Sequence, residues 1–183
     1  RSGAMPVLEG CTIATNHAES GGGGIYAHHS SISLAACIVH SNESRDTGGG
    51  LLLNTATLTA WSCDFDRNRT GVGLVSQPIV GPYAYGGGFR GIKASVSLTS
   101  CRIRENAGVH YGGAMYLSGP LTMDSCLVEN NTATRGGGLS IAGGTHSIRR
   151  TVLAGNVAVE GQVGGIYGAY KNAGAIALGS TAV

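Results

Sequence analysis

The sequence predicts an all-β protein, specifically a right-handed parallel β-helix (a solenoid) of about six coils, with roughly 25 residues and three short strands per coil. Three observations lead to this prediction. An asparagine follows each cysteine by five residues, two apolar alternations of opposite phase flank each cysteine, and glycine runs recur between the copies. A motif order that returns at a nearly fixed period is typical of coils stacked along an axis.

The spacing between copies defines the coil. Successive cysteines are 26, 26, 38 and 25 residues apart, and a sixth copy has Thr151 in the cysteine position. The long spacing is one ordinary period plus about 12 residues, which we assign to an inserted loop at 72–83. The predicted columns are the cysteines Cys11, Cys37, Cys63, Cys101 and Cys126, and the asparagines Asn16, Asn42, Asn68, Asn106, Asn131 and Asn156.

Two strands flank a corner next to each cysteine. The residue two positions after the cysteine is always apolar, as in Val39 and Phe65, and the residues three and five positions before it are apolar as well. These alternations differ in phase by one residue, which a continuous strand cannot do without exchanging its faces. We therefore place a corner between them, at Ala35-Ala36, Trp61-Ser62, Thr99-Ser100 and Asp124-Ser125, and a third strand after the glycines, at 51–53, 114–116 and 139–141.

The stacked geometry explains the residue types. Neighbouring coils lie about 4.8 Å apart, so equivalent side chains form columns. We expect each cysteine to point inward as a small apolar side chain and to stay a thiol, although adjacent coils are close enough for a disulfide. We expect the asparagines to hydrogen-bond along a column at a tight corner, and the glycines to permit close approach at the next corner.

The repeat resembles that of the chlamydial polymorphic outer-membrane proteins, described as F-x-x-N with G-G-A-I. Phe65-Asp66-Arg67-Asn68 matches the first half, and Gly112-Gly113-Ala114-Met115 nearly matches the second. The other copies use Ile, Val or Leu in place of Phe. The resemblance covers nearly the whole chain and implies a right-handed β-helix on a cell surface or in an extracellular structure, with an adhesive or architectural role.

Composition narrows the choice of partners. The 183 residues carry a formal net charge of +2 without charged runs, so nucleic acids and anionic membranes are poor candidates. No apolar stretch approaches the roughly 20 residues of a membrane span. We expect a single β-helix domain over 1–183, part of a longer array, whose partners are other proteins, copies of itself or glycans. We expect no cofactor and no metal site.

A carbohydrate-active β-helix enzyme, a polysaccharide lyase or hydrolase, is the first alternative. The outward positions beside the cysteines stack Asp64 on Arg102, and Asp66 on Arg104 and then Glu129. We interpret this column as cross-strand charge pairing, worth about 0.2–1 kcal/mol per pair. A neighbouring cation stabilises the ionised carboxylate, whereas a general acid needs the protonated one. We therefore name no catalytic residue.

An ice-binding solenoid is the second alternative. Outward positions of the first strand carry hydroxyl groups in five coils, including Ser31, Ser33, Thr57 and Thr59. Regular arrays of threonine on β-solenoids resemble those of ice-binding proteins. Half of these residues are serine, however, and Pro120 interrupts the array. Exposed strand positions favour threonine without any ligand.

Two surface features remain. The loop at 72–83 carries apolar residues that predict docking on a partner or on another subunit, namely Leu74, Val75, Ile79, Val80 and Tyr83. Three Asn-x-Ser/Thr sequons occur, and only Asn130 among them lies outside the asparagine column, so it is the candidate for glycosylation. The sequence thus favours a structural extracellular or cell-surface module that assembles or adheres through its faces and this loop.

Overall fold

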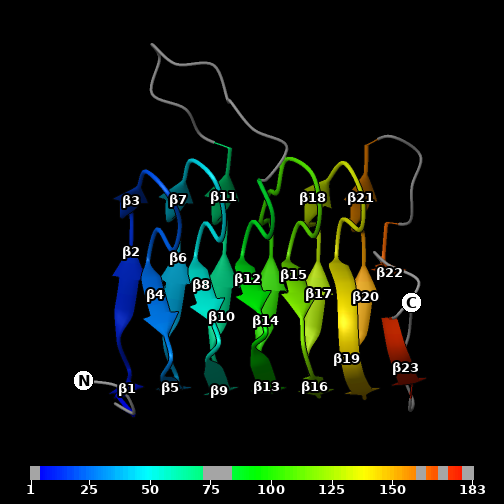
Figure 1. Cartoon of the computed structure of the whole chain (residues 1–183), viewed down its shortest axis with the longest axis horizontal. Helices are drawn as coiled ribbons and strands as arrows, with labels where there is room; N and C mark the ends of the chain where they lie inside the picture. The colour runs from blue at the N-terminus through cyan, green and yellow to red at the C-terminus, as the bar shows by residue number, and fades with distance from the viewer. Residues whose placement is uncertain (1–4, 72–83, 160–163, 169–172, 179–183) are drawn as a thin grey trace.

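The computed structural model describes residues 5–71, 84–159, 164–168 and 173–178, and its strands wind into a parallel solenoid (Figure 1). Three faces run along the axis. The first contains β1 (Val7–Glu9), β5 (Ser31–Ala35), β9 (Thr57–Trp61), β13 (Ser95–Thr99), β16 (Leu121–Asp124), the end of β19 (Leu139–Arg149) and β23 (Ala173–Leu178). The second contains β2 (Thr12–Ala14), β6 (Ile38–His40), β10 (Asp64–Asp66), β14 (Arg102–Arg104), β17 (Leu127–Glu129) and β20 (Val152–Ala154).

The third face follows the glycine runs. It contains β4 (Ile25–His28), β8 (Leu51–Asn54), β12 (Phe89–Ile92), β15 (Met115–Ser118), the start of β19 and β22 (Ile166–Gly168). All pairings are parallel, and the six strands of the second face span five full turns, close to the predicted six coils. The prediction of an all-β parallel solenoid is confirmed.

The corners lie where the two alternations change phase. Between the first and second faces, single residues adopt a left-handed backbone, with φ of 48° at Ala36 and 53° at both Ser62 and Ser100. One such residue reverses which side chains point inward, so both flanking strands bury their apolar residues. A second set of left-handed residues directly precedes the asparagines, for example Ser41 (53°) and Arg67 (50°).

Two features differ from the predicted three strands per coil. A two-residue strand follows the asparagine in most coils, at β3 (His17–Ala18), β7 (Glu43–Ser44), β11 (Arg69–Thr70), β18 (Thr132–Ala133) and β21 (Val157–Ala158). In addition, β19 runs through the position of a corner, because Gly143 and Gly144 (φ 155° and 101°) continue the strand with a register shift. Glycine permits this backbone, so the third face passes into the first without a break.

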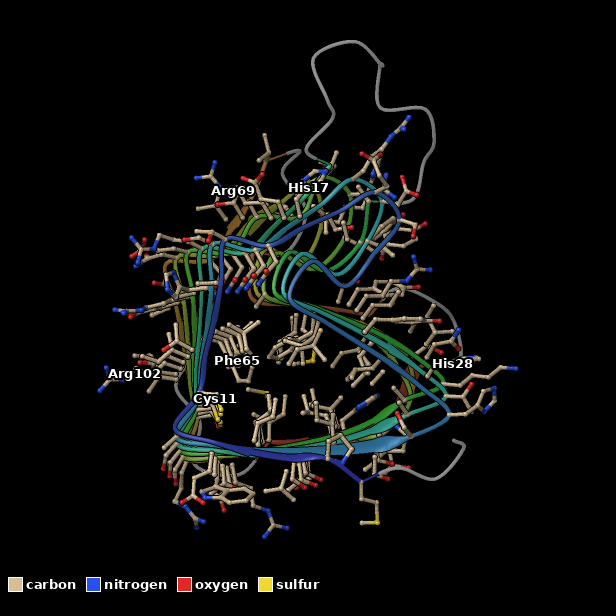
Figure 2. The ribbon with its side chains drawn as sticks, turned by 90° about the vertical axis from the view of Figure 1, so that its left-hand side faces the viewer. Cys11, His17, His28, Phe65, Arg69 and Arg102 are labelled. Carbon is tan, nitrogen blue, oxygen red and sulfur yellow. The ribbon has the colours of Figure 1, made fainter. Side chains whose placement is uncertain are left out.

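The interior is filled by columns of apolar side chains from the three faces. Figure 2 looks along the axis and shows Phe65 inside the tube and Arg102 outside it, on the same face. The largest fully buried side chains include Leu34, Leu58, Leu98 and Met123. Phe65 and Phe89 meet edge to face with ring centroids 4.4 Å apart, which joins the second and third faces where the extra 12 residues interrupt the repeat.

Candidate functional site

The asparagines form one hydrogen-bonded column at the corner after the second face. The Nδ2 of Asn42 donates to Oδ1 of Asn68 (3.0 Å), and Asn68 donates in the same way to Asn106 (3.1 Å). Each Oδ1 within the column also accepts a hydrogen bond from the backbone N–H of the preceding asparagine, as Oδ1 of Asn68 does from Asn42 (3.0 Å). Four members have no exposed surface, whereas Asn16 at the start of the column is exposed and Asn156 is half-buried. The sequons at Asn42 and Asn68 are therefore inaccessible in the fold.

The five cysteines are free thiols in a second inward column, and only Cys11 is not fully buried. Burial raises the pKa of Cys37. Hydrogen bonding with the Cys126 and Cys63 side chains, and then burial, raise the pKa of Cys101. The same contact with Cys101 lowers the pKa of Cys63 to about 7, but this residue is only 1% exposed. Reagent access, not ionisation, therefore limits the reactivity of its sulfur.

The charged residues on the second face have the predicted register, in which Asp64 pairs with Arg102 and Asp66 with Arg104. Asp66 is buried, and its nearest cation is one that the sequence analysis did not pair with it. Nη2 of Arg67 lies 2.8 Å from Oδ2 of Asp66, whereas Nε of Arg104 lies 3.8 Å from Oδ1. Oδ1 and Nε of this longer pair are buried without hydrogen bonds to the protein. The ion-pair partners of Asp66 are therefore two arginines, which supports charge pairing and not a catalytic pair of carboxylates.

The hydroxyl residues of the first face are also in register. Ser31 pairs with Thr57, and Ser33 pairs with Thr59, which pairs in turn with Ser97. Trp61 belongs to the same strand as the two threonines and is 43% exposed, so the hydroxyl strip is bordered by a large indole. Serine, threonine and tryptophan together form a mixed polar surface.

A group of aromatic and basic residues on the outside of the third face was not predicted. We call Tyr85, Arg90, Tyr111, Tyr116 and Arg135 the tyrosine–arginine cluster. The rings of Tyr85 and Tyr116 stack with centroids 4.7 Å apart and an interplanar angle of 17°. The guanidinium carbon of Arg90 lies 4.8 Å from the Tyr85 centroid, and that of Arg135 lies 5.4 Å from the Tyr111 centroid.

The backbone aligns this cluster across coils. Parallel bridges join Thr47 to Tyr85, Tyr85 to Tyr111, and Tyr111 to Arg135. Each of these residues directly precedes a glycine run, so this position forms an outward column beside the strands of the third face. The signal in the sequence was the recurrence of Tyr before Gly-Gly at 85 and 111, and it could have been found by comparing that position between copies.

Two further predicted features concern single places in the chain. Asn130 is exposed at a corner with φ of 54°, and its glycosylation stays a prediction. The apolar loop residues at 74, 75, 79, 80 and 83 lie outside the described residues. Among the residues that the structure does describe, no group of three or more His, Cys, Asp and Glu side chains is placed to hold a metal ion, and no helix is long and apolar enough to cross a membrane.

The chain was compared with models of known protein families. The model of the family described as the right-handed β-helix region matches residues 1–175. No curated protein and no solved structure gives a significant match.

Proposed function

The chain belongs to the family of right-handed β-helix proteins, and from this premise we propose that it is a structural module of an extracellular structure or cell surface. In this role it assembles with partner proteins or with copies of itself, or adheres to them, through its outer faces and the loop at 72–83. Right-handed β-helix proteins include pectate lyase-like enzymes and non-enzymes, so the family alone does not decide between these roles.

The hydrogen-bonded asparagine column is the observation that carries this proposal. It runs without a break from Asn16 to Asn156, and each interior side chain bonds to the coils on both sides. Hydrogen bonds between buried side-chain amides connect every coil to the next. They resist bending and separation of the coils, because each broken hydrogen bond leaves a buried polar group unpaired. A stiff rod with repeated outer faces suits a spacer that holds surface components at fixed distances.

The repeat motif supports the surface location. The Phe65 side chain is fully buried in the interior of the solenoid, and Asn68 is a fully buried member of the asparagine column. The F-x-x-N half of the motif is therefore explained by the fold. The resemblance of the whole repeat to those of the polymorphic outer-membrane proteins is what supports a surface location and an adhesive or architectural role.

The test is made on the cells that produce the protein. An antibody against the chain should label intact cells or their extracellular material, and chemical cross-linking followed by mass spectrometry should recover links from the outer faces to other proteins or to further copies. Labelling that requires permeabilised cells, with no intermolecular cross-links, would refute the proposal.

A polysaccharide lyase or hydrolase is the alternative function, supported by the buried Asp66 carboxylate on an outer face. Its Oδ1 has no hydrogen bond, and Arg104 lies beside it. Degradation of polyuronates by the purified chain, lost in Asp66→Ala and Arg104→Ala while the fold is retained, would establish this alternative and displace the structural role.

Ice binding is a second alternative, favoured by the in-register hydroxyl columns of the first face. Exchange of Thr57 and Thr59 for leucine should abolish thermal hysteresis if this surface orders water. Absence of hysteresis in the unaltered chain excludes the alternative directly.

A further inference from the structure

The side chain of His146 points into the interior of the solenoid and is 1% exposed. Parallel pairing places it in a column whose other described members on the first face are all apolar, namely Ile32, Leu58, Val96 and Leu121. Neither Nδ1 nor Nε2 of His146 has a hydrogen-bond partner in the protein. Buried polar atoms are normally paired, and a buried charge without a partner is far more costly than a neutral group. The site therefore suits only the neutral imidazole.

No charged group faces His146 from the described strands that pack around it. The charged residues of these strands, Asp124, Glu129 and Arg149, point outward. β23 has the sequence AGAIAL, which contains no ionisable residue, and the Cys126 thiol at the corner after β16 is uncharged in acid. An imidazolium in the interior would therefore lose its hydration without gaining a counter-ion. The inward side chains of β16, β17, β19, β20 and β22 are apolar apart from His146: Leu121, Met123, Val128, Leu139, Ile141, Ile148, Leu153 and Ile166.

The backbone pairing of the strand that carries His146 is irregular directly beside this residue. β19 shifts its register against β23 between Gly144 and His146, and against β15 at Gly143. Figure 1 shows β22 and β23 beside β19 on the side away from β16, and in the described part of the chain both pair with β19 alone. Because each coil of a solenoid contacts only its neighbours, one such interface can open locally while the other coils stay folded.

We propose that His146 is an acid-sensitive switch, whose protonation separates β19 from β22 and β23 and exposes the edge of β19 for pairing with another strand. Burial lowers the pKa of His146 in the closed form, whereas an exposed histidine titrates near pH 6.5. The open form therefore binds the proton more tightly. Each pH unit below about 6.5 favours opening by up to about tenfold, until the pH reaches the pKa of the closed form. The exposed edge of β19 would offer unpaired backbone N–H and C=O groups to a partner strand.

The experiment measures amide hydrogen exchange by mass spectrometry at pH 7.5 and pH 5, with rates corrected for the intrinsic effect of pH on exchange. We expect peptides from β19 and β23 to exchange faster at pH 5, by up to about thirtyfold, while peptides from β9 and β13 keep their protection. His146→Leu should abolish this pH response, because leucine is the residue that Leu121 provides in the preceding coil. The matched control is His28→Leu, which removes an exposed histidine from the third face and should leave the response unchanged.

Three results would overturn the proposal: equal protection of β19 and β23 at the two pH values, an equal loss of protection in β9 and β13, or the same pH response in His146→Leu and His28→Leu. The second result would indicate general acid destabilisation and not a local opening. If His146→Leu does not fold, His146→Gln is the substitute, since glutamine stays neutral at both pH values. A pH response retained in that variant would also refute the role of His146. The inference does not depend on the proposed structural role, because local exchange is measured on the isolated chain.

Discussion

Replacement of Asn68 by alanine removes a buried interior side chain of the asparagine column that makes four hydrogen bonds. Its Nδ2 donates to the carbonyl of Val39 (2.9 Å) and to Oδ1 of Asn106 (3.1 Å), and its Oδ1 accepts from the backbone N–H and Nδ2 of Asn42 (3.0 Å each). At about 1 kcal/mol per net hydrogen bond, these four bonds are worth about 4 kcal/mol. The substitution should cost at least that much, because the donors of Asn42 remain buried without an acceptor.

The matched control is Asn16→Ala, at the exposed start of the same column. The side chain of Asn16 makes one hydrogen bond to another residue of the column, from Nδ2 to Oδ1 of Asn42 (2.9 Å). The backbone N–H of Asn16, which donates to the same oxygen, is retained in alanine. We expect this variant to lose about 1 kcal/mol or less, since the groups it uncovers can bind water.

Urea unfolding followed by far-UV circular dichroism measures both variants against the unaltered chain. The midpoint for Asn68→Ala should fall clearly below that for Asn16→Ala. If the two variants lose the same stability, the bonds along the column contribute nothing beyond local corner geometry, and the reasoning about axial stiffness is wrong.

Three further predictions can be tested by urea unfolding and by labelling of cysteine thiols. Gly49→Ala should lower the free energy of unfolding by about 3 kcal/mol or more, because its Cβ would lie 2.3 Å from the backbone oxygen of Arg69. The control Gly10→Ala meets no atom within 4 Å and should cost about 1–2 kcal/mol for its φ of 61° alone. Equal losses in the two variants would contradict close packing between coils. In the native chain Cys11 should react first with a thiol reagent, and Cys11→Ala should remove that fast phase; reaction of several thiols at one rate would show that the column is accessible. Burial lowers the pKa of His146, so the unfolded chain binds more protons than the folded chain below about pH 6.5. The free energy of unfolding should therefore fall as the pH falls through that value towards the folded pKa. His146→Leu should remove this dependence, and an unchanged pH profile in the variant would refute the role of His146.

The inward columns and the corners could be predicted because the sequence repeats the same residue types at the same spacing. Cysteine, asparagine and apolar residues recur there since each must fit against its own copy in the next coil. The phase change at Ser62 and Ser100 was visible in the alternation alone. The inward orientation of His146 could also have been predicted, because Thr145 and Ser147 point outward and the residue between them must then point inward. In the structure His146 is 1% exposed.

The tyrosine–arginine cluster could not be predicted in the same way. Its outward column contains Thr47, Tyr85, Tyr111 and Arg135, so no residue type repeats throughout. The stacked pair Tyr85 and Tyr116 comes from two neighbouring columns and two coils, and its spacing of 31 residues matches no period. The continuous β19 was missed for a different reason: a glycine pair indicates a turn in most contexts, and only the register with β16 shows that the chain stays extended.

The position before each glycine run combines a fixed backbone with a free choice of side chain. At Gly86 and Gly112 an added Cβ would lie 1.8 and 2.1 Å from the backbone oxygens of Phe89 and Met115, so only glycine fits directly after Tyr85 and Tyr111. The side chains before these glycines point outward, and the residue type changes along the column from Thr47 through Tyr85 and Tyr111 to Arg135. Different residue types therefore occupy this position in different coils, while their backbone atoms stay in register. A binding site built in this column would gain new specificity by substitution of single residues, which is the physical reason to look for ligands there rather than along the uniform inward columns.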